Sequence, residues 1–252
     1  MNENKLRKQW EEEEKAGFEG WDFSHLNNRW EDEKIPWNYK DIVLKYLKPN
    51  KSLLDMGTGG GEFLLSLNHP YNITSVTEAW QPNVDLCKEK LEPLGICVRQ
   101  VVDDNHIPYE DNSFDIVINR HEAYSISEIK RVLKPSGLFI SQQVGGKNNR
   151  ILSEKLIRNF RTQFPKFDLS HEVEKLKELG FEVLFKDEYY PYLRFFDIGA
   201  IVYFAKVIEW EFPNFSVDSC FERLCILQNE IEEKGYVESL EHRFIFIMKN
   251  MK

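Results

Sequence analysis

Short apolar runs alternate with amphipathic segments between about residues 38 and 145. Apolar residues recur at helical spacing in segments 39–47, 61–68, 83–95 and 122–137. Compact apolar runs typical of buried strands lie at 52–56, 73–78, 97–102, 114–120 and 138–144. Because strands and helices that alternate at this rhythm are joined by right-handed crossovers, the pattern predicts a parallel sheet covered by helices on both faces.

The rhythm changes after Gly145. Helical spacing returns in 149–164, 171–180 and 219–235, and strand-like runs lie at 181–191 and 242–250. Between them, the apolar residues of 197–208 fall on one helical stripe, formed by Ile198, Ile201, Val202, Ala205 and Ile208. We therefore predict a helix there rather than a strand.

These segments predict one α/β domain over residues 1–252, with a doubly wound, mostly parallel sheet of seven strands. Residues 1–37 lie outside the repeating pattern and carry four tryptophans, Trp10, Trp21, Trp30 and Trp37. They are expected to cover a sheet edge or pocket. An insert of about 195–236 before the last strand is rich in aromatic residues and is expected to complete a helical lid. The alternative for most of these aromatic residues is that they fill a core.

The overall composition narrows the choice of partners. The net charge of −9 argues against a nucleic-acid ligand, which needs a clustered basic face. No apolar run approaches the length of a membrane span, and the N-terminus has no secretory core. The four cysteines form no close pair, which favours free thiols in a cytoplasmic protein and argues against a metal site. Oligomeric state is left open.

A glycine-rich turn stands between the first strand and the next helix, in the sequence DMGTGGGEF. Glycine accepts positive φ and lets the backbone approach a ligand closely. In open α/β sheets, ligands bind beyond the carboxyl ends of the strands. A dinucleotide turn needs GxGxxG, but here the spacing is Gly57, Gly59, Gly61, and Glu62 takes the place of the last glycine. This departure argues against a nicotinamide enzyme.

The segment LLDMGTGGGEF resembles motif I of the class I S-adenosylmethionine-dependent methyltransferases. Glu78 ends the second strand where this family places the acid that binds both ribose hydroxyls. The stretch VVDDNHIPYEDNSFDIVI is similar to the family's GDAxxLPFxDxSFDxV and puts Asp103 at the adenine amino group. RVLKPSGLFI looks like the helix, turn and strand that close the cofactor half. TEAWQPNV, NRHE and SQQVGG resemble an uncharacterised bacterial small-molecule branch, similar to methyltransferase type 11.

The resemblance covers roughly residues 38–145 and implies that they form a cofactor-binding core for S-adenosylmethionine, with residues 146–252 as the substrate half. Asp55 is expected to orient the cofactor's ammonium or to hold the glycine turn through backbone N–H groups. Asp104 is the alternative to Asp103. Trp80 is a candidate to stack on adenine, with core burial and simple exposure as alternatives. The candidate cofactor-binding residues are Asp55, Gly57, Thr58, Gly59, Gly61, Glu78, Trp80, Asp103, Asp104 and Asn119.

The candidate catalytic residues lie at the end of the strand 114–120. Methyl transfer from a sulfonium is an in-line displacement, so the protein mainly aligns the reactants, and a base is needed only if the nucleophile must lose a proton. His121 is the natural general base because its ordinary pKa is near neutrality. Its alternative role is packing against the cofactor or binding a loop. Arg120 is a candidate to bind an acidic substrate group.

These features together predict an S-adenosylmethionine-dependent methyltransferase that acts on a small molecule, at an O, N or C atom. The first alternative is a methyltransferase that acts on a protein or an RNA, which would require a basic face beside the pocket. The second alternative is a cofactor-binding module without catalysis, or a nicotinamide-dependent reductase.

Overall fold

Strands and helices alternate along the first half of the chain as the apolar pattern predicts. The computed structural model describes residues 3–18 and 23–252. The chain divides into two compact units, and each unit has an apolar core of its own. The core unit consists of residues 36–144, 167–188 and 244–252. The second unit consists of the described residues up to Ile35 together with 145–166 and 189–243.

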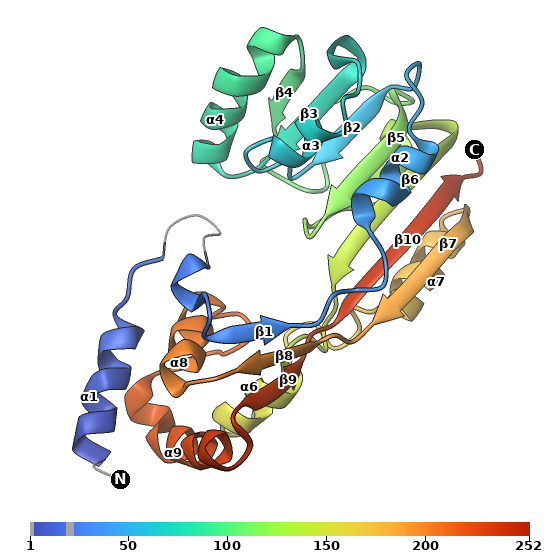
Figure 1. Ribbon diagram of the computed structural model, residues 1–252. Coiled ribbons are helices and arrows are strands. Elements are labelled where there is room, and N and C mark those ends of the chain that lie inside the picture. The colour runs from blue at the N-terminus through green and yellow to red at the C-terminus, as the bar shows by residue number, and fades with distance from the viewer. Residues whose placement is uncertain (1–2, 19–22) are drawn as a thin grey trace. The chain divides into compact units, whose positions relative to one another are not determined.

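The core unit is built on a mixed sheet. Among the described residues its strands are β2 (Leu53–Met56), β3 (Thr74–Glu78), β4 (Cys97–Gln100), β5 (Phe114–Arg120), β6 (Leu133–Val144), β7 (Phe181–Tyr189) and β10 (Arg243–Asn250). They are ordered β4-β3-β2-β5-β6-β10-β7. Strands β2 to β6 pair in parallel, and Figure 1 shows β10 running against β6. The predicted seven-stranded, mostly parallel sheet is confirmed.

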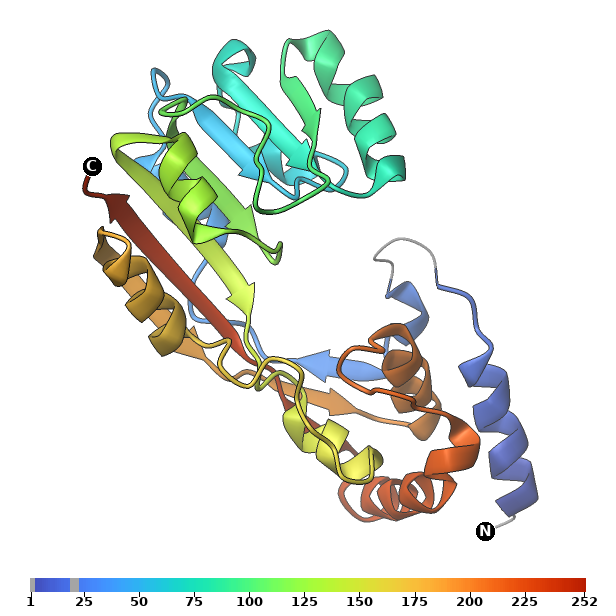
Figure 2. The ribbon, with the colours of Figure 1, turned by 180° about the vertical axis from the view of Figure 1, so that it is seen from behind.

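Helices cover both faces of this sheet (Figures 1 and 2). They are α2 (Tyr39–Tyr46), α3 (Glu62–Ser66), α4 (Gln81–Leu91), α5 (Ile126–Val132) and α7 (Leu169–Glu178). Neighbouring strand residues point to opposite faces. Accordingly, Ile118 lies in the apolar cluster that includes α2, α3 and α4, whereas Val117 lies in the cluster that includes α5 and α7. Short 3-10 turns are formed by η2 (Tyr71–Ile73) and η3 (Glu92–Leu94).

The second unit contains a small antiparallel sheet that the apolar pattern does not reveal. Its strands are β1 (Trp30–Asp32), β8 (Tyr192–Phe195) and β9 (Val237–Leu240), in the order β1-β8-β9. Its helices are α1 (Glu3–Glu14), η1 (Ser24–Leu26), α6 (Arg150–Leu156), α8 (Ile198–Val207) and α9 (Val217–Lys234). The helix predicted for 197–208 is confirmed as α8. Asp197 caps it by accepting a hydrogen bond from the Ala200 N–H at 2.8 Å.

Two predicted boundaries are wrong. The helix expected over 149–164 ends at Leu156, because Ile157 is extended and most of the residues from 158 to 166 are exposed, with no apolar face to bury. The helix expected over 122–137 ends at Val132. Strand β6 then begins at Leu133 and passes through an irregularity in its pairing with β5, where Ser136 takes a positive φ of 61°.

The expected substrate half is divided between the two units. Segments 167–188 and 244–252 complete the core unit, and the remainder belongs to the second unit. Of the tryptophans expected to form a cover, Trp10 and Trp30 lie in the second unit and Trp37 lies in the core unit, while Trp21 lies outside the described residues. The lid role of 195–236 stays a prediction. No helix within residues 3–18 and 23–252 is long and apolar enough to cross a membrane.

Candidate functional site

The candidate site lies where the strand order of the core unit reverses. From β2 the chain continues to β3 and β4 on one side, and then to β5 and β6 on the other. The carboxyl ends of parallel strands on either side of such a reversal form a crevice that binds ligands. Met56 at the end of β2 is paired with Asn119 of β5, and Glu78 ends β3 next to it. The sheet therefore brings the predicted residues Asp55, Glu78 and Asn119 to adjacent strand ends.

The glycine loop, residues 57–61, connects β2 to α3. Gly57, Gly59 and Gly61 have φ values of 64°, 61° and 81°, a region that side chains rarely allow. A Cβ on Gly57 would lie 2.6 Å from Cγ of Glu122, so this glycine is also needed for space. A Cβ on Gly59 would have no neighbour within 4 Å. The loop thus presents bare backbone to open space at Gly59.

Glu78 fixes the position of the glycine loop. One carboxylate oxygen accepts a hydrogen bond of 2.7 Å from the Gly59 N–H, and the other accepts one of 3.2 Å from the Ala79 N–H. The residue is only 6% exposed. A carboxylate can accept about four hydrogen bonds, so these two contacts leave capacity for ligand hydroxyls. The expected binding of ribose stays a prediction, and the contact with the loop is a second role that the sequence did not indicate.

Asp55 lies buried behind the loop. Its carboxylate accepts a 2.7 Å hydrogen bond from the hydroxyl of Thr58. The loop is therefore held through the Thr58 side chain and not, as one alternative supposed, by backbone N–H groups bound to Asp55. Burial, helped by the negative charge of Glu78, raises the pKa of Asp55 to about 7 against the opposing effects of Thr58 and Arg120. Ionised Asp55 would therefore favour a cation beside it.

A third carboxylate completes an acidic group around the glycine loop. Glu122 lies against Gly57, and burial together with the charges of Glu78 and Asp104 raises its pKa. Within the part of the chain that the structure describes, Asp55, Glu78 and Glu122 form no salt bridge. The described residues also contain no group of three or more His, Cys, Asp or Glu placed to hold a metal ion. No salt bridge among the described residues offsets the negative charge at these strand ends, which suits a cationic organic ligand.

Asn119 contributes an unsatisfied donor to the same strand ends. The side chain is fully buried, and its oxygen accepts a 2.6 Å hydrogen bond from the amide of Gln143. Its Nδ2 has no hydrogen-bond partner among residues 3–18 and 23–252. Buried polar atoms are nearly always paired, so this orphaned donor is a departure from stable packing at the carboxyl end of β5.

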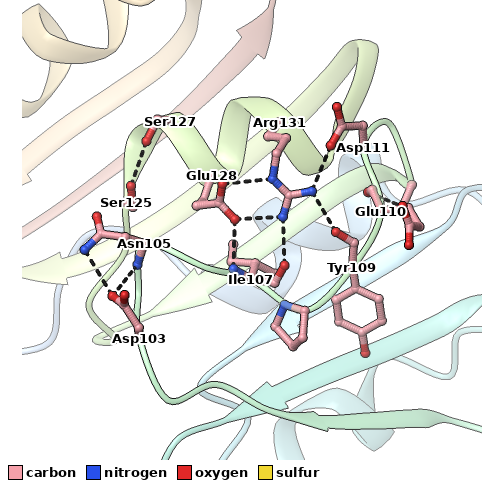
Figure 3. Close-up of polar contacts among 12 residues, drawn as sticks. Asp103, Asn105, Ile107, Tyr109, Glu110, Asp111, Ser125, Ser127, Glu128 and Arg131 are labelled. Carbon is pink, nitrogen blue, oxygen red and sulfur yellow. Dashed lines mark hydrogen bonds and ion pairs between the residues drawn. The ribbon is translucent and has the colours of Figure 1, made fainter.

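The loop after β4 carries the predicted adenine-side acids Asp103 and Asp104, and Figure 3 shows the contacts of Asp103. Asp103 is exposed, and its carboxylate accepts hydrogen bonds from the backbone and side chain of Asn105 at 2.9 and 3.1 Å. Arg131 of α5 donates to the carbonyl oxygens of Ile107 and Tyr109, each at 2.7 Å. These contacts fix the loop on α5. The adenine-binding role of Asp103, and of Asp104 as its alternative, stays a prediction.

Two exposed apolar side chains flank Glu78. Trp80, just after β3, is 59% exposed, which excludes the alternative of core burial. Val102, which follows β4, is 92% exposed, and the neighbouring Val101 N–H donates to the Glu78 carbonyl at 3.0 Å. Exposed apolar side chains near the carboxyl ends of neighbouring strands suit a flat ring. Val102 was missed from the sequence because an apolar residue after a buried strand looks like a continuation of that strand.

The predicted catalytic residues follow β5 directly. The guanidinium of Arg120 lies 4.5 Å from the centre of the Phe63 ring. His121 has a positive φ of 64°, and its Nε2 lies 3.1 Å from the side-chain nitrogen of Gln142. The oxygen of Gln142 accepts a 2.8 Å hydrogen bond from the indole of Trp37. Gln142 and Trp37 were not predicted as site residues, because their contacts join segments far apart in the sequence.

Comparison with known proteins agrees with this geometry. Residues 54–141 match the family model described as a methyltransferase domain. The matched stretch runs from β2 into β6 and includes the glycine loop, Glu78 and Asn119. A stretch of 89 residues is 32% identical to phthiotriol/phenolphthiotriol dimycocerosates methyltransferase of Mycobacterium tuberculosis. That match covers 32% of this chain and 32% of its relative.

Solved structures share the methyltransferase fold over most of the chain. A putative methyltransferase from Bacillus halodurans superimposes with a TM-score of 0.57 at 16% identity, over 84% of this chain and 99% of the other. A geranyl diphosphate methyltransferase, solved with GPP and sinefungin, gives 0.51 at 11% identity, over 83% and 77% of the two chains. At such low identities the likeness shows the fold.

Proposed function

We propose that the protein is an S-adenosylmethionine-dependent methyltransferase that acts on a small-molecule acceptor. The observation that carries the proposal is the bare glycine loop among buried carboxylates that form no salt bridge among the described residues. S-adenosylmethionine carries a sulfonium and an ammonium, so its charge complements this group. When bound, the cofactor supplies the electrophilic methyl group, and the protein's part is to bind and align.

The residues at the strand ends fit this cofactor. Gly59 offers backbone at an open position, and Glu78 retains acceptor capacity for hydroxyl groups. Asp55 and Glu122 supply negative charge, and Asn119 supplies an unpaired N–H. Burial raises the pKa values of the two acids and neighbouring carboxylates raise them further, so a cation bound here would favour the ionised form of both.

A small-molecule acceptor is favoured over a nucleic acid by the net charge of −9. The similar Mycobacterium protein is named for phthiotriol/phenolphthiotriol dimycocerosates, and one neighbour of the same fold is a geranyl diphosphate methyltransferase. Arg120, at the end of β5 and without a salt bridge among the described residues, is proposed to bind an acidic group of the acceptor. His121 follows it and is proposed to contact the acceptor as well.

The test is calorimetric titration of the full chain with S-adenosylmethionine and, separately, with NADH and NADPH. Binding of the methyl donor should be lost in Glu78→Gln and retained in Glu89→Gln, a matched substitution at an exposed position on α4. Binding of a nicotinamide cofactor and none of the methyl donor would overturn the proposal.

The acceptor is identified with a methyl-labelled donor in an extract of the source cells. We expect the label to appear in the small-molecule fraction, and to be absent there when Glu78→Gln replaces the unmodified protein. Label that appears only in protein or RNA would contradict the proposed acceptor class while leaving the cofactor assignment intact.

A further inference from the structure

We infer that Trp37 and Gln142 hold His121 as the neutral tautomer protonated at Nδ1, so that its Nε2 accepts a hydrogen bond from Gln142 and His121 does not act as general base toward the acceptor. The role toward the acceptor rests on the proposed function. The tautomer itself does not, because it follows from three side chains of the core unit.

The argument begins at Trp37. An indole N–H can only donate a hydrogen bond, so the atom of Gln142 that faces it at 2.8 Å must be the amide oxygen. That contact fixes which way the amide is turned. The amide nitrogen of Gln142 then faces Nε2 of His121 at 3.1 Å. Turning the amide over would oppose its NH₂ group to the indole N–H and leave both donors unpaired.

The second step concerns the imidazole. An amide NH₂ group donates and does not accept, so Nε2 of His121 must be the accepting nitrogen. In a neutral imidazole one nitrogen accepts and the other carries the proton, which places the proton on Nδ1. A base needs an available lone pair. In this arrangement the lone pair of Nε2 is engaged by Gln142, and Nδ1 is protonated.

The backbone supports the assignment of His121 to the site. The residue has a left-handed φ of 64°, which few residues other than glycine adopt, and its N–H donates to the Gln142 carbonyl at 2.9 Å. Strained residues of this kind persist where surrounding structure holds them, and they cluster at functional sites. Gln142 therefore holds both the backbone and the ring of His121, which makes it a positioning residue.

The test is nuclear magnetic resonance of the full chain labelled with ¹⁵N-histidine, without ligand, at pH 8. Two-bond correlations distinguish protonated from unprotonated ring nitrogens, and the signals lost in His121→Gln assign the residue. We expect Nδ1 protonated and Nε2 unprotonated. In Gln142→Glu, which has the same shape but only acceptor oxygens, Nε2 should become the protonated nitrogen.

Two further variants separate the tautomer from general effects on the fold. Trp37→Phe keeps an aromatic ring but removes the indole N–H. The Gln142 amide can then turn, and both tautomers of His121 should appear. Gln100→Glu makes the same chemical change on β4, where the side chain contacts the Ala79 carbonyl, and should leave the His121 signals unchanged. If Gln142→Glu does not fold, Trp37→Phe decides the question.

Protonation of Nε2 in the unmodified protein would overturn the inference. So would an unchanged tautomer in folded Gln142→Glu and Trp37→Phe. Neither readout depends on the methyl donor, so failure of the inference is distinguishable from failure of the proposed function. Once an acceptor is known, a Gln142→Glu variant that still binds the methyl donor but turns over more slowly supports the positioning role.

Discussion

Replacing Asp55 with asparagine should stabilise the ligand-free protein at alkaline pH while weakening its binding of the methyl donor. Burial, with help from Glu78, raises the pKa of Asp55 to about 7, whereas the same group in the unfolded chain has its ordinary value of 3.8. Ionisation of Asp55 therefore opposes folding. A shift of this size corresponds to about 4 kcal/mol when it acts in full.

The sign follows from proton binding by Asp55. Between about pH 4 and pH 7 the folded protein keeps a proton that the unfolded chain has released, so stability falls as pH rises through this window. The asparagine variant has no such group, and its amide oxygen can still accept the hydrogen bond from Thr58. The stability of Asp55→Asn relative to the unmodified protein should thus increase by about 2–3 kcal/mol between pH 5 and pH 8.

The assay is urea unfolding of both proteins without ligand at the two pH values, with m-values compared to check that the same transition is measured. Asp115→Asn is the matched control. Burial opposes ionisation of Asp115, but hydrogen bonds from Lys134, Ser52 and Lys51 outweigh it and hold its pKa well below the ordinary range. The stabilising contribution of ionised Asp115 is present above about pH 4. The free energy of unfolding of Asp115→Asn should therefore lie below that of the unmodified protein by a similar amount at pH 5 and pH 8.

The reasoning about Asp55 is refuted if the stabilities of Asp55→Asn and the unmodified protein change in parallel from pH 5 to pH 8. A variant that gains stability but binds the methyl donor as tightly as before would separate the buried charge from the cofactor. The expected result is gained stability with lost binding, the exchange that is common at ligand sites.

Three other substitutions test the supports of the site. Arg131→Met removes the donors to the Ile107 and Tyr109 carbonyls and should lower the free energy of unfolding by about 2 kcal/mol. Amide hydrogen exchange in residues 103–111 should become faster, and unchanged exchange would show that α5 does not fix this loop. Gly57→Ala should abolish binding of the methyl donor in calorimetry and lower the free energy of unfolding by about 1–2 kcal/mol, because φ is positive at this position and Glu122 occupies the space that a Cβ needs. Normal binding would contradict the role of the bare turn. Tyr39→Phe should cost about 1 kcal/mol in urea unfolding, because its buried hydroxyl donates to two strand carbonyls, and no change would mean that those carbonyls find other donors.

Most of the grouping of candidate residues at the strand ends could be predicted from the sequence, because these residues occupy places that local pattern marks. Asp55 and Glu78 end apolar strands, and the glycines stand between a strand and a helix. In a parallel sheet such ends meet at one edge, so one-dimensional spacing is enough to place them together. What Asp55 binds was not predictable, because Thr58 and the backbone offered equivalent local partners.

The contacts around His121 could not be predicted in this way. Trp37 and Gln142 are separated by more than a hundred positions, and neither stands in a motif. Their pairing depends on where the segment before α2 crosses the end of β6, which is decided by tertiary packing. The small sheet of the second unit was missed for a similar reason. Its strands are three or four residues long and too short for alternation to separate them from loops.

The amino and carboxyl ends of the central strands differ in how well their polar groups are paired, and this difference indicates which end binds a ligand. At the amino ends of β2 and β5, Asp115 is bound by two lysines and by Ser52, so charge and hydrogen bonds are satisfied. At the carboxyl ends of the same strands, Asp55 is buried and forms no salt bridge among the described residues, Asn119 has an orphaned N–H, and His121 has a left-handed backbone. Charges and hydrogen bonds are therefore satisfied at the amino ends of these strands, whereas Asp55, Asn119 and His121 each depart from stable packing at the carboxyl ends. Because such departures are expected where a ligand completes the structure, the chain's own energetics indicate the end that binds.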